Sequence, residues 1–591
     1  MHPDVTRKQP AAEAAHGGPL PRHVRLLVRL ARRQLPAPVC EVSVQRGIAV
    51  PAGDGITLLT DHYRPLTAGP HPALLIRTPY GRGFPWDYLY GALLGEQGFH
   101  VVIQSCRGTG GSHGAFEPFV GEASDAQAAI AWLRQQDWFN GVLGTIGPSY
   151  LGFTQWALAT DPPPELRAMV VQVSSDDFHG FLYPGGAFAL EATLTGVAAM
   201  RSMHRGMGAF TVAVLRLMRR YRRVARTLPL IDAYPAAFGG RIGYFEGWIT
   251  HPEPGDPYWA PRRATVSPEL IPPASLLTGW SDVCLEQTLG LYRRLREAGR
   301  AVRLVVGPWT HTSGFSRDLP VLFGEALGWL HQHLDDNGTG AGAASLPVRV
   351  HVGETGGPGR WRDLADWPPP GFAEHPWHLR GDGTLGAEPA TAGTLSSFRY
   401  DPADPTPSVG GPRMDSRDAG SRRNNALESR KDVLVFTSEP LTGPLDVIGP
   451  VSLRVRARGS TPHFDVFARL CDVDPNGTSW NICDGLLRLG GERGSGDGAA
   501  GAADGAWRDV TVPMSATAHR FGAGHRLRVQ LSGGAHPRFV RNTGTGEPLA
   551  TATRLVPVEI EISDGRVLVP SANADLMPPA RAGDHRPGSG R

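Results

Sequence analysis

Ser149, Asp282 and His311 are the residues whose types and placement could do chemistry together. A serine hydroxyl is a poor nucleophile at neutral pH, so it needs a histidine base, and the base needs a carboxylate that fixes its tautomer. Each of the three comes shortly after an apolar run of the kind typical of buried parallel strands. Their order along the chain, serine then acid then histidine, predicts a catalytic triad for acyl transfer.

The segment around Ser149 reads Gly-Thr-Ile-Gly-Pro-Ser-Tyr-Leu-Gly over residues 144–152. We expect a strand, a sharp turn and a helix here, with the serine hydroxyl held clear of the sheet edge as in a nucleophile elbow. Gly147 and Gly152 supply the small residues needed where strand and helix crowd together. The second glycine comes three residues after Ser149, so the spacing departs from the usual G-x-S-x-G motif.

Each of these residues also has an ordinary interpretation when considered by itself. Ser149 could be a solvated serine in a tight turn between a strand and a helix. Asp282 could be the N-cap of a helix predicted over residues 283–295. His311 is one of 21 histidines. The joint placement of all three at strand ends, in the expected order, is what favours the triad.

The elements that must position these residues alternate between strand and helix. Short apolar runs at 73–77, 100–104 and 168–173 predict buried strands, and the spacing of apolar residues over 122–137 predicts a helix. This alternation indicates an α/β fold with a doubly wound parallel sheet. Residues 188–226 have helical spacing and no strand signal, so we expect a helical cap over the edge of the sheet where ligands bind.

Beyond residue 340 the pattern becomes short alternating runs separated by Gly, Pro and Asp, as in an all-β sandwich or jelly roll. A length of 591 residues is enough for two or three domains. We therefore predict an N-terminal extension over 1–41, a catalytic domain over 42–176 and 260–340, a helical cap insertion over 177–259, a β jelly-roll domain over 341–577 and a tail over 578–591.

Three segments resemble the α/β-hydrolases of the cocaine esterase/NonD-like family and the related X-Pro dipeptidyl peptidases. They are G-P-S-Y-L-G at 147–152, G-W-S-D at 279–282 and G-P-W-T-H at 307–311. The resemblance extends over nearly the whole chain after about residue 42 and implies the α/β-hydrolase fold with a C-terminal jelly roll. Pro148 is a departure, because relatives often have a small branched residue before the nucleophile.

The resemblance also implies roles for five residues. Ser149 would be the nucleophile, His311 the base and Asp282 the carboxylate that orients it. The segment Arg77-Thr78-Pro79-Tyr80 looks like the family's R-x-P-Y segment, so the hydroxyl of Tyr80 and the backbone N–H of Tyr150 would form the oxyanion hole. Such donors are needed wherever charge develops on a carbonyl oxygen.

Composition excludes several other classes of protein. A net charge of +3 gives no general affinity for polyanions, so no nucleic acid is expected as partner. The five cysteines include no C-x-x-C pair, which argues against a zinc site or a disulfide framework. The glycine-rich run at 108–114 resembles a dinucleotide loop, but the residues after it do not begin a helix. We expect no cofactor and no metal.

No apolar run reaches the roughly 18 residues of a membrane span, and no secretory signal is evident, so we expect a cytoplasmic protein. Residues 22–35 form a basic amphipathic helix candidate that could lie on a membrane surface or pack on the body of the enzyme. The motifs are compatible with a homo-oligomer and do not fix the oligomeric state.

The predicted function is a serine hydrolase that cleaves a small-molecule acyl ester through an acyl-enzyme. An X-Pro dipeptidyl peptidase, or another amide or α-amino ester hydrolase, is the alternative within the enzyme class. A non-catalytic protein that binds carbohydrate or another protein is the alternative from a different class.

Overall fold

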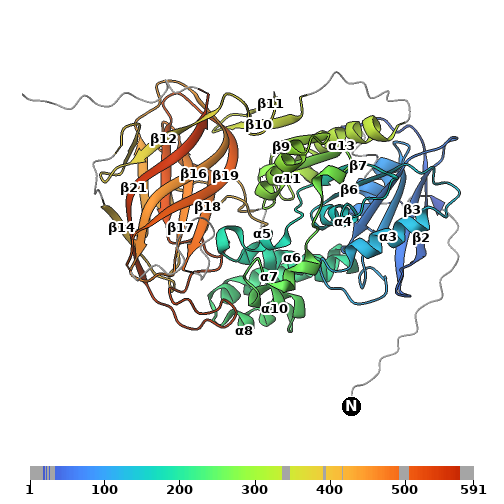
Figure 1. Cartoon of the computed structure of the whole chain (residues 1–591), viewed down its shortest axis with the longest axis horizontal. Coiled ribbons are helices and arrows are strands. Elements are labelled where there is room, and N and C mark those ends of the chain that lie inside the picture. Colours follow the sequence, from blue (N-terminus) through green and yellow to red (C-terminus); the bar gives the residue numbers. More distant parts are fainter. Residues whose placement is uncertain are drawn as a thin grey trace, which may run out of the picture.

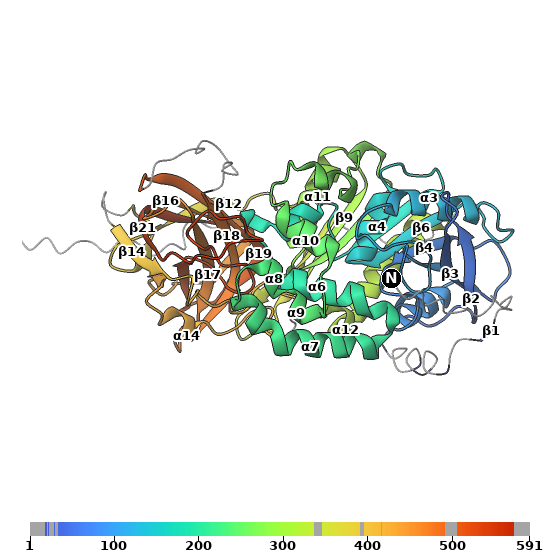
Figure 2. The ribbon, with the colours of Figure 1, turned by 90° about the horizontal axis from the view of Figure 1, so that it is seen from below.

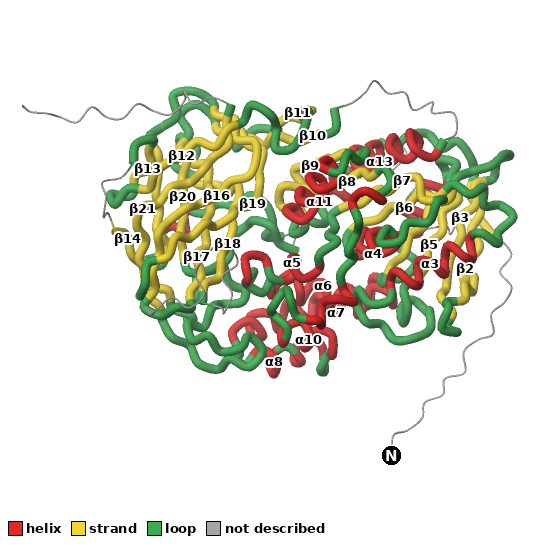
Figure 3. The backbone as a smooth tube through the Cα atoms, viewed as in Figure 1, coloured by secondary structure: helices red, strands yellow, loops and turns green. Residues whose placement is uncertain are grey.

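The computed structural model describes residues 18–19, 22, 26, 29, 34–335, 346–389, 395–414, 417–490 and 505–572. Figure 1 shows an α/β half in blue to green and a half made of strands in yellow to red, with the helices α5 to α10 between them. Figure 3 shows the same division: one half holds red helices and yellow strands, and the other holds mostly yellow strands joined by green loops. Most of the predicted N-terminal extension, including most of the helix expected over 22–35, and the predicted tail over 578–591 lie outside the described residues.

The α/β half contains the expected doubly wound sheet. From β5 to β10 the neighbouring strands are parallel, in the order β5–β4–β6–β7–β8–β9–β10, and antiparallel strands flank them on both sides. Its strands are β1 (Gly18–Pro19), β2 (Val42–Pro51), β3 (Thr57–Pro65), β4 (Ala73–Thr78), β5 (His100–Ser105), β6 (Leu143–Pro148), β7 (Leu166–Gln172), β8 (Ala274–Ser281), β9 (Val302–Thr310), β10 (Val348–Glu354) and β11 (Arg360–Leu364).

Helices cover both faces of this sheet, because its central strands are apolar on both sides. Helices α3, α4 and α11 pack in the apolar cluster of one face, and η1, α2 and α13 pack in that of the other. These helices, with the short α12 beside them, are η1 (Asp87–Ala92), α2 (Leu93–Gly95), α3 (Glu122–Leu133), α4 (Tyr150–Leu158), α11 (Leu285–Glu297), α12 (Gly314–Arg317) and α13 (Leu319–Leu334).

The segment between β7 and β8 is helical, as its sequence predicts. Figure 2 shows its longest member, α7, running along one side of the molecule. The helices are α5 (Phe178–Leu182), η2 (Pro184–Gly186), α6 (Leu190–Ser202), η3 (Met203–Arg205), α7 (Met207–Arg226), α8 (Leu230–Ala233), α9 (Pro235–Phe238), α10 (Gly243–Thr250), η4 (Pro257–Arg262) and η5 (Pro268–Leu270).

The C-terminal half is built mostly of strands around its own apolar core. One layer places β16 between β19 and β21, and the other has the order β15–β20–β17–β18. The elements are β12 (Ala373–Leu379), β13 (Thr384–Gly386), β14 (Leu395–Tyr400), α14 (Asn425–Glu428), β15 (Val433–Ser438), β16 (Leu445–Gly459), β17 (Phe464–Val473), β18 (Ser479–Leu489), β19 (Arg508–Phe521), β20 (Arg526–Ser532) and β21 (Val558–Ser571).

Strand β10 joins the two halves. The predicted boundary at 340/341 assigns it to the β domain, but Val348 to Val350 pair with β9 and extend the hydrolase sheet. Only its last residues, Gly353 and Glu354, pair with β19 of the β domain. Alternating apolar residues fit either sheet equally well, so the sequence pattern could not distinguish the two partners.

The cap and the β domain are in close contact. The N–H of Val540 donates to the carbonyl of Phe188 at 2.9 Å, and the N–H of Ile231 donates to the carbonyl of Ala550 at 3.0 Å. At Gly185 an added Cβ would lie 1.7 Å from the carbonyl oxygen of Leu486, so only glycine fits. The β domain is therefore packed against the cap as part of one body.

Two further findings concern the cysteines and the helices. All five cysteines are free thiols. Within the described part of the chain, every helix is too short or too polar to cross a membrane.

Candidate active site

Ser149 lies at the apex of the predicted turn, between the end of β6 and the start of α4. Its backbone has φ 56° and ψ −121°, a conformation that a residue with a side chain rarely adopts and that a nucleophile elbow imposes. A Cβ at Gly147 would lie 2.6 Å from the Cβ of Leu151, and one at Gly152 would lie 2.4 Å from the Cβ of Ser174. Both glycines therefore permit the crowding that raises the serine above the sheet.

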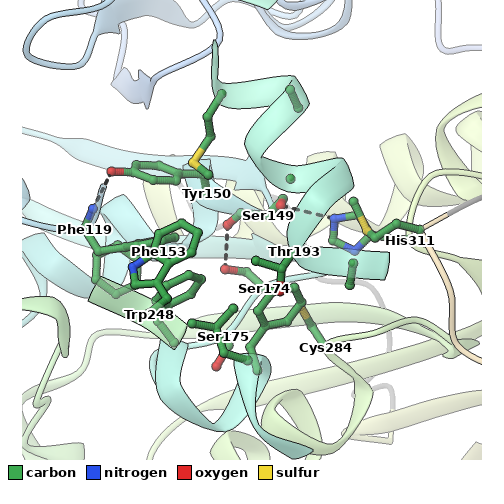
Figure 4. A pocket seen from close by; sticks show the side chains of 18 of the residues that line it. Phe119, Ser149, Tyr150, Phe153, Ser174, Ser175, Thr193, Trp248, Cys284 and His311 are labelled. Carbon is green, nitrogen blue, oxygen red and sulfur yellow. Dashed lines mark hydrogen bonds between the residues drawn. The ribbon is translucent and has the colours of Figure 1, made fainter. Parts of the chain in front are cut away.

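The structure brings Ser149, His311 and Asp282 together. The Nε2 of His311 lies 3.1 Å from the Oγ of Ser149, and its Nδ1 lies 2.8 Å from Oδ1 of Asp282. Asp282 follows β8 and His311 follows β9, so two neighbouring strands deliver the acid and the base. Figure 4 shows the imidazole of His311 facing the serine hydroxyl. This arrangement can move a proton from serine to histidine while the carboxylate holds the ring.

Tyr80 and Tyr150, the residues expected in the oxyanion hole, flank Ser149. Tyr80 lies just after β4 and lines the same pocket as Ser149. Burial raises the pKa of the Tyr80 phenol, which keeps the phenol protonated as a donor. Tyr150 is the first residue of α4, so its N–H has no acceptor within the helix. Two donors are thus positioned beside the serine.

The ring of Tyr150 is held by groups that the motifs did not identify. Its hydroxyl donates to Oε1 of Glu122 at 2.8 Å and accepts from the N–H of Phe119, also at 2.8 Å. The other oxygen of Glu122 forms a 2.7 Å ion pair with Arg77, which is buried. Arg77 belongs to the R-x-P-Y segment, so the sequence offered a signal for it but none for Glu122.

Two further hydroxyls support the site and were also missed. Thr278 donates to Oδ2 of Asp282 at 2.7 Å, so both oxygens of this buried carboxylate accept hydrogen bonds. Ser174 donates to the backbone carbonyl of Ser149 at 2.7 Å, as Figure 4 shows. Each lies on or after a strand of the parallel sheet, but a single hydroxyl residue carries no motif that would reveal its role.

A pocket of about 700 Å³, counting the space open to solvent, lies beside the serine. Its walls come from the elbow, from α5, α6 and α10 of the cap, and from the β domain through Met414. The side chains in Figure 4 are mainly aromatic and aliphatic. The lining residues are Tyr80, Phe119, Ser149, Tyr150, Phe153, Ser174, Ser175, Phe178, Phe181, Leu182, Ala192, Thr193, Gly196, Ala199, Met200, Trp248, Cys284, His311 and Met414.

Among the described residues, one group of metal-ligand types lies close together, and it belongs to this site. Asp282, Cys284 and His311 offer ligand atoms within 4.8 Å of one another. The imidazole Nδ1 is already bonded to Asp282. Burial, followed by the charge of Asp282, raises the pKa of the Cys284 thiol well above its ordinary value. A thiol that resists ionisation is a poor metal ligand, so the group fits proton transfer better than metal binding.

Comparison with known proteins relates both halves of the chain to hydrolases. The profile of the X-Pro dipeptidyl-peptidase (S15) family matches residues 54–313, and that of the X-Pro dipeptidyl-peptidase C-terminal non-catalytic domain matches residues 339–580. The cocaine esterase of Rhodococcus sp. (strain MB1 Bresler) is 32% identical over 545 residues, which cover 86% of this chain and 94% of that protein.

Solved structures share the fold at lower identity. An α-amino acid ester hydrolase superimposes with a TM-score of 0.74 at 21% identity, covering 97% of this chain and 99% of its own. A CocE/NonD family hydrolase from Staphylococcus aureus superimposes with a TM-score of 0.66 at 17% identity, covering 90% of this chain and 94% of its own. The α/β-hydrolase fold with a C-terminal domain of mostly strands is therefore common to all of them.

Proposed function

The chain belongs to the cocaine esterase/NonD-like family of serine hydrolases, and on that premise we propose that it hydrolyses uncharged carboxylic esters through an acyl-enzyme on Ser149. The observation that carries the proposal is the pair of short contacts from His311, one to the serine hydroxyl and one to Asp282. The proposed catalytic residues are Ser149, His311 and Asp282, with Tyr80 and the Tyr150 N–H as oxyanion donors.

The first half-reaction transfers the acyl group to the enzyme. The Oγ of Ser149 attacks the ester carbonyl carbon while Nε2 of His311 takes the hydroxyl proton. Negative charge then develops on the carbonyl oxygen, where the Tyr80 hydroxyl and the Tyr150 N–H donate hydrogen bonds. The C–O bond to the alcohol breaks as His311 returns the proton to the leaving oxygen. Asp282 holds the imidazole and stabilises its protonated form.

The second half-reaction releases the acid. His311 takes a proton from a water molecule, whose oxygen attacks the acyl carbon of the acyl-enzyme. The bond to Oγ of Ser149 breaks, and the proton passes from His311 back to the serine. The products are the carboxylic acid and the regenerated enzyme.

The composition of the pocket wall favours neutral acyl groups. No Asp, Glu, Lys or Arg is among the described residues that line it. The free ammonium of an X-Pro dipeptide or of an α-amino ester would lose its hydration there without a carboxylate to replace it, which costs several kcal/mol. The aromatic residues Phe119, Phe153 and Phe178 instead offer apolar contact. We therefore place neutral esters ahead of X-Pro amides and α-amino esters.

We also propose that the β domain is a jelly roll, supported by its two layers of mainly antiparallel strands. This domain would stabilise the structure and supply part of the pocket wall, because all three proposed catalytic side chains precede residue 335. A cytoplasmic location is part of the same proposal.

The test compares neutral aryl esters of acetate, butyrate and benzoate with an aminoacyl ester and an X-Pro anilide. We expect the wild-type enzyme to turn over the neutral esters, and Ser149→Ala to lower kcat by roughly 10⁴- to 10⁶-fold. A fluorophosphonate should label Ser149. The matched control is Ser397→Ala, which changes an exposed serine of β14 and should keep full activity. Labelling at another serine, or faster turnover of the substrates that carry an ammonium, would contradict the proposal.

A further inference from the structure

The β domain places one segment, described over residues 410–414 and 417–420, at the ends of the strands that carry the acid and the base. Gly411 and Gly420 close the segment by exchanging N–H···O=C bonds of 2.8 and 3.0 Å. A Cβ added at Gly420 would lie 3.9 Å from both the Oγ of Ser281 and the Cγ2 of Thr310. These two residues immediately precede Asp282 and His311. The end of the segment that the two glycines close therefore lies against the ends of β8 and β9.

Within this segment, Met414 forms part of the pocket wall, and Arg413 beside it is buried. The guanidinium of Arg413 forms an ion pair with Glu191, which is also buried, at 3.4 Å between Nε and Oε2. Glu191 lies in the first turn of α6, directly before Ala192 and Thr193 of the same pocket wall. The ion pair therefore joins two walls of the pocket at the residues next to their lining side chains.

Both partners of this ion pair are held by further contacts. Arg413 also pairs with Asp418, which ties the segment back onto itself. The N–H of Glu191 donates to the carbonyl of Arg538 at 3.5 Å. The guanidinium of Arg538 in turn bonds the buried carboxylate of Asp484 at 2.5 Å. Ion pairs and hydrogen bonds therefore hold both Arg413 of the β domain and Glu191 of the cap in place.

Resting on the ester hydrolase function above, we propose that Arg413 and Glu191 are a positioning pair that sets the distance between the Met414 wall and the α6 wall, and so the size of acyl group accepted. A buried ion pair adds little net stability, because desolvation offsets the attraction, but it is demanding in geometry. An arginine fork adds direction that a lysine would not. The pair is well suited to fixing a spacing.

The experiment measures kcat and KM for the aryl acetate, butyrate and benzoate with wild type, Arg413→Met, Arg413→Lys and the double variant Glu191→Gln/Arg413→Met. The double variant removes both charges, so no unpaired carboxylate is left in the interior. The matched control is Arg303→Met, which breaks a half-buried 2.8 Å ion pair with Glu325 at the far end of β9. Melting temperature is recorded for every variant.

We expect the ratio of kcat/KM between benzoate and acetate to change by about tenfold in both Arg413→Met and the double variant, mostly through KM. The acetate kcat should stay within about threefold of wild type, because no catalytic group is altered. The kcat/KM ratio between benzoate and acetate for Arg413→Lys should lie between the ratios of wild type and Arg413→Met. The double variant should recover melting temperature relative to Arg413→Met while its selectivity stays changed.

A purely structural role would give a different result. If the double variant recovers both stability and wild-type selectivity, or if Arg303→Met shifts selectivity as much, the positioning role is overturned. Equal losses for all three esters would also overturn it. Failure of the underlying function is separate, since it would appear as an inactive wild-type enzyme toward every ester.

Discussion

An aspartate carboxylate accepts hydrogen bonds from histidine at two buried places in the described part of the chain. In the hydrolase sheet, Asp282 accepts from Nδ1 of His311 at 2.8 Å. In the β domain, Asp472 accepts from Nε2 of His519 at 2.9 Å and from Nδ1 of His525 at 2.8 Å. The two carboxylates are equally buried and their contacts equally short. An Asp–His pair with good geometry is therefore not in itself a catalytic site.

The difference lies in what surrounds the pair. The second nitrogen of His311 lies within hydrogen-bonding distance of the hydroxyl of Ser149, in a pocket that also holds the proposed oxyanion donors. Both oxygens of Asp472 are taken by imidazoles, and within the described structure neither ring has a serine hydroxyl among its hydrogen-bond partners. The turn that presents Ser149, rather than the Asp–His pair, therefore distinguishes the proposed hydrolase site.

The largest predicted effect breaks the first pair. Asp282→Asn keeps the shape of the side chain but removes the charge that fixes the tautomer of His311 and stabilises its protonated form. We expect kcat for a neutral ester to fall about 10⁴-fold. The melting temperature should change little beside that loss. Steady-state kinetics and thermal unfolding of the purified variant measure both.

The matched control is Asp472→Asn, which should show the opposite pattern. Burial alone would raise the pKa of Asp472, but its bonds to His519, Thr355 and His525 lower the pKa overall. The charged carboxylate is therefore the hydrogen-bond acceptor for both imidazoles. Its removal should destabilise the fold by roughly 3 kcal/mol and leave kcat nearly unchanged. A large loss of kcat without a loss of stability would show that the β-domain pair contributes to catalysis after all.

The hydroxyl of Tyr80, a proposed oxyanion donor, is the next group to remove. Tyr80→Phe keeps the ring that stacks on Trp86 and removes only the hydroxyl. We expect kcat to fall about 10²-fold, because the missing hydrogen bond would form in the transition state. Melting temperature should be nearly constant. An effect confined to KM would mean that Tyr80 binds substrate without stabilising the oxyanion.

Much of this site follows from local sequence. The turn at Ser149 could be predicted because Gly147 and Gly152 are required by backbone crowding, which is a local demand. The acid and the base could be predicted because parallel strands deliver their carboxyl ends to one edge of the sheet. The roles of Tyr80 and Tyr150 came from a resemblance to a family rather than from any pattern in the residues themselves.

What the sequence did not predict depends on contacts between distant segments. Met414 and Arg413 reach the pocket from the β domain, and Glu191 meets Arg413 across 222 positions of the chain. Glu122 bonds the hydroxyl of Tyr150 from the first turn of α3, and the sequence of that turn contains no motif that predicts this contact. Strand β10 pairs with two sheets, and its alternating apolar pattern suits both. Periodicity reports that a face is buried, but it does not identify what covers that face.

The smallest predicted effect concerns a third arrangement, in which two imidazoles bond to each other. Nε2 of His62 lies 2.9 Å from Nδ1 of His100, and the indole of Trp138 stacks on both rings. Burial, and then the proximity of His100, lowers the pKa of His62 from 6.5 to about 3. Burial, with His71 and Arg64 nearby, lowers the pKa of His100 to about 4. Both rings are therefore neutral in the folded protein across the usual working range.

This arrangement predicts how stability depends on pH. In the unfolded chain both histidines take up a proton near pH 6.5, whereas in the folded chain they do so only near pH 3 to 4. Between these pH values the unfolded state binds more protons than the folded state. The free energy of unfolding is therefore fully present above about pH 6.5 and falls with pH, by up to about 1.4 kcal/mol per pH unit for each histidine.

His62→Phe keeps a ring against Trp138 and removes one titrating group, so the fall in melting temperature between pH 7 and pH 5 should be shallower than in wild type. His113→Gln, which alters an exposed imidazole, should leave that slope unchanged. An identical slope in wild type and His62→Phe would mean that the buried pair opens to water and takes up protons as in the unfolded chain.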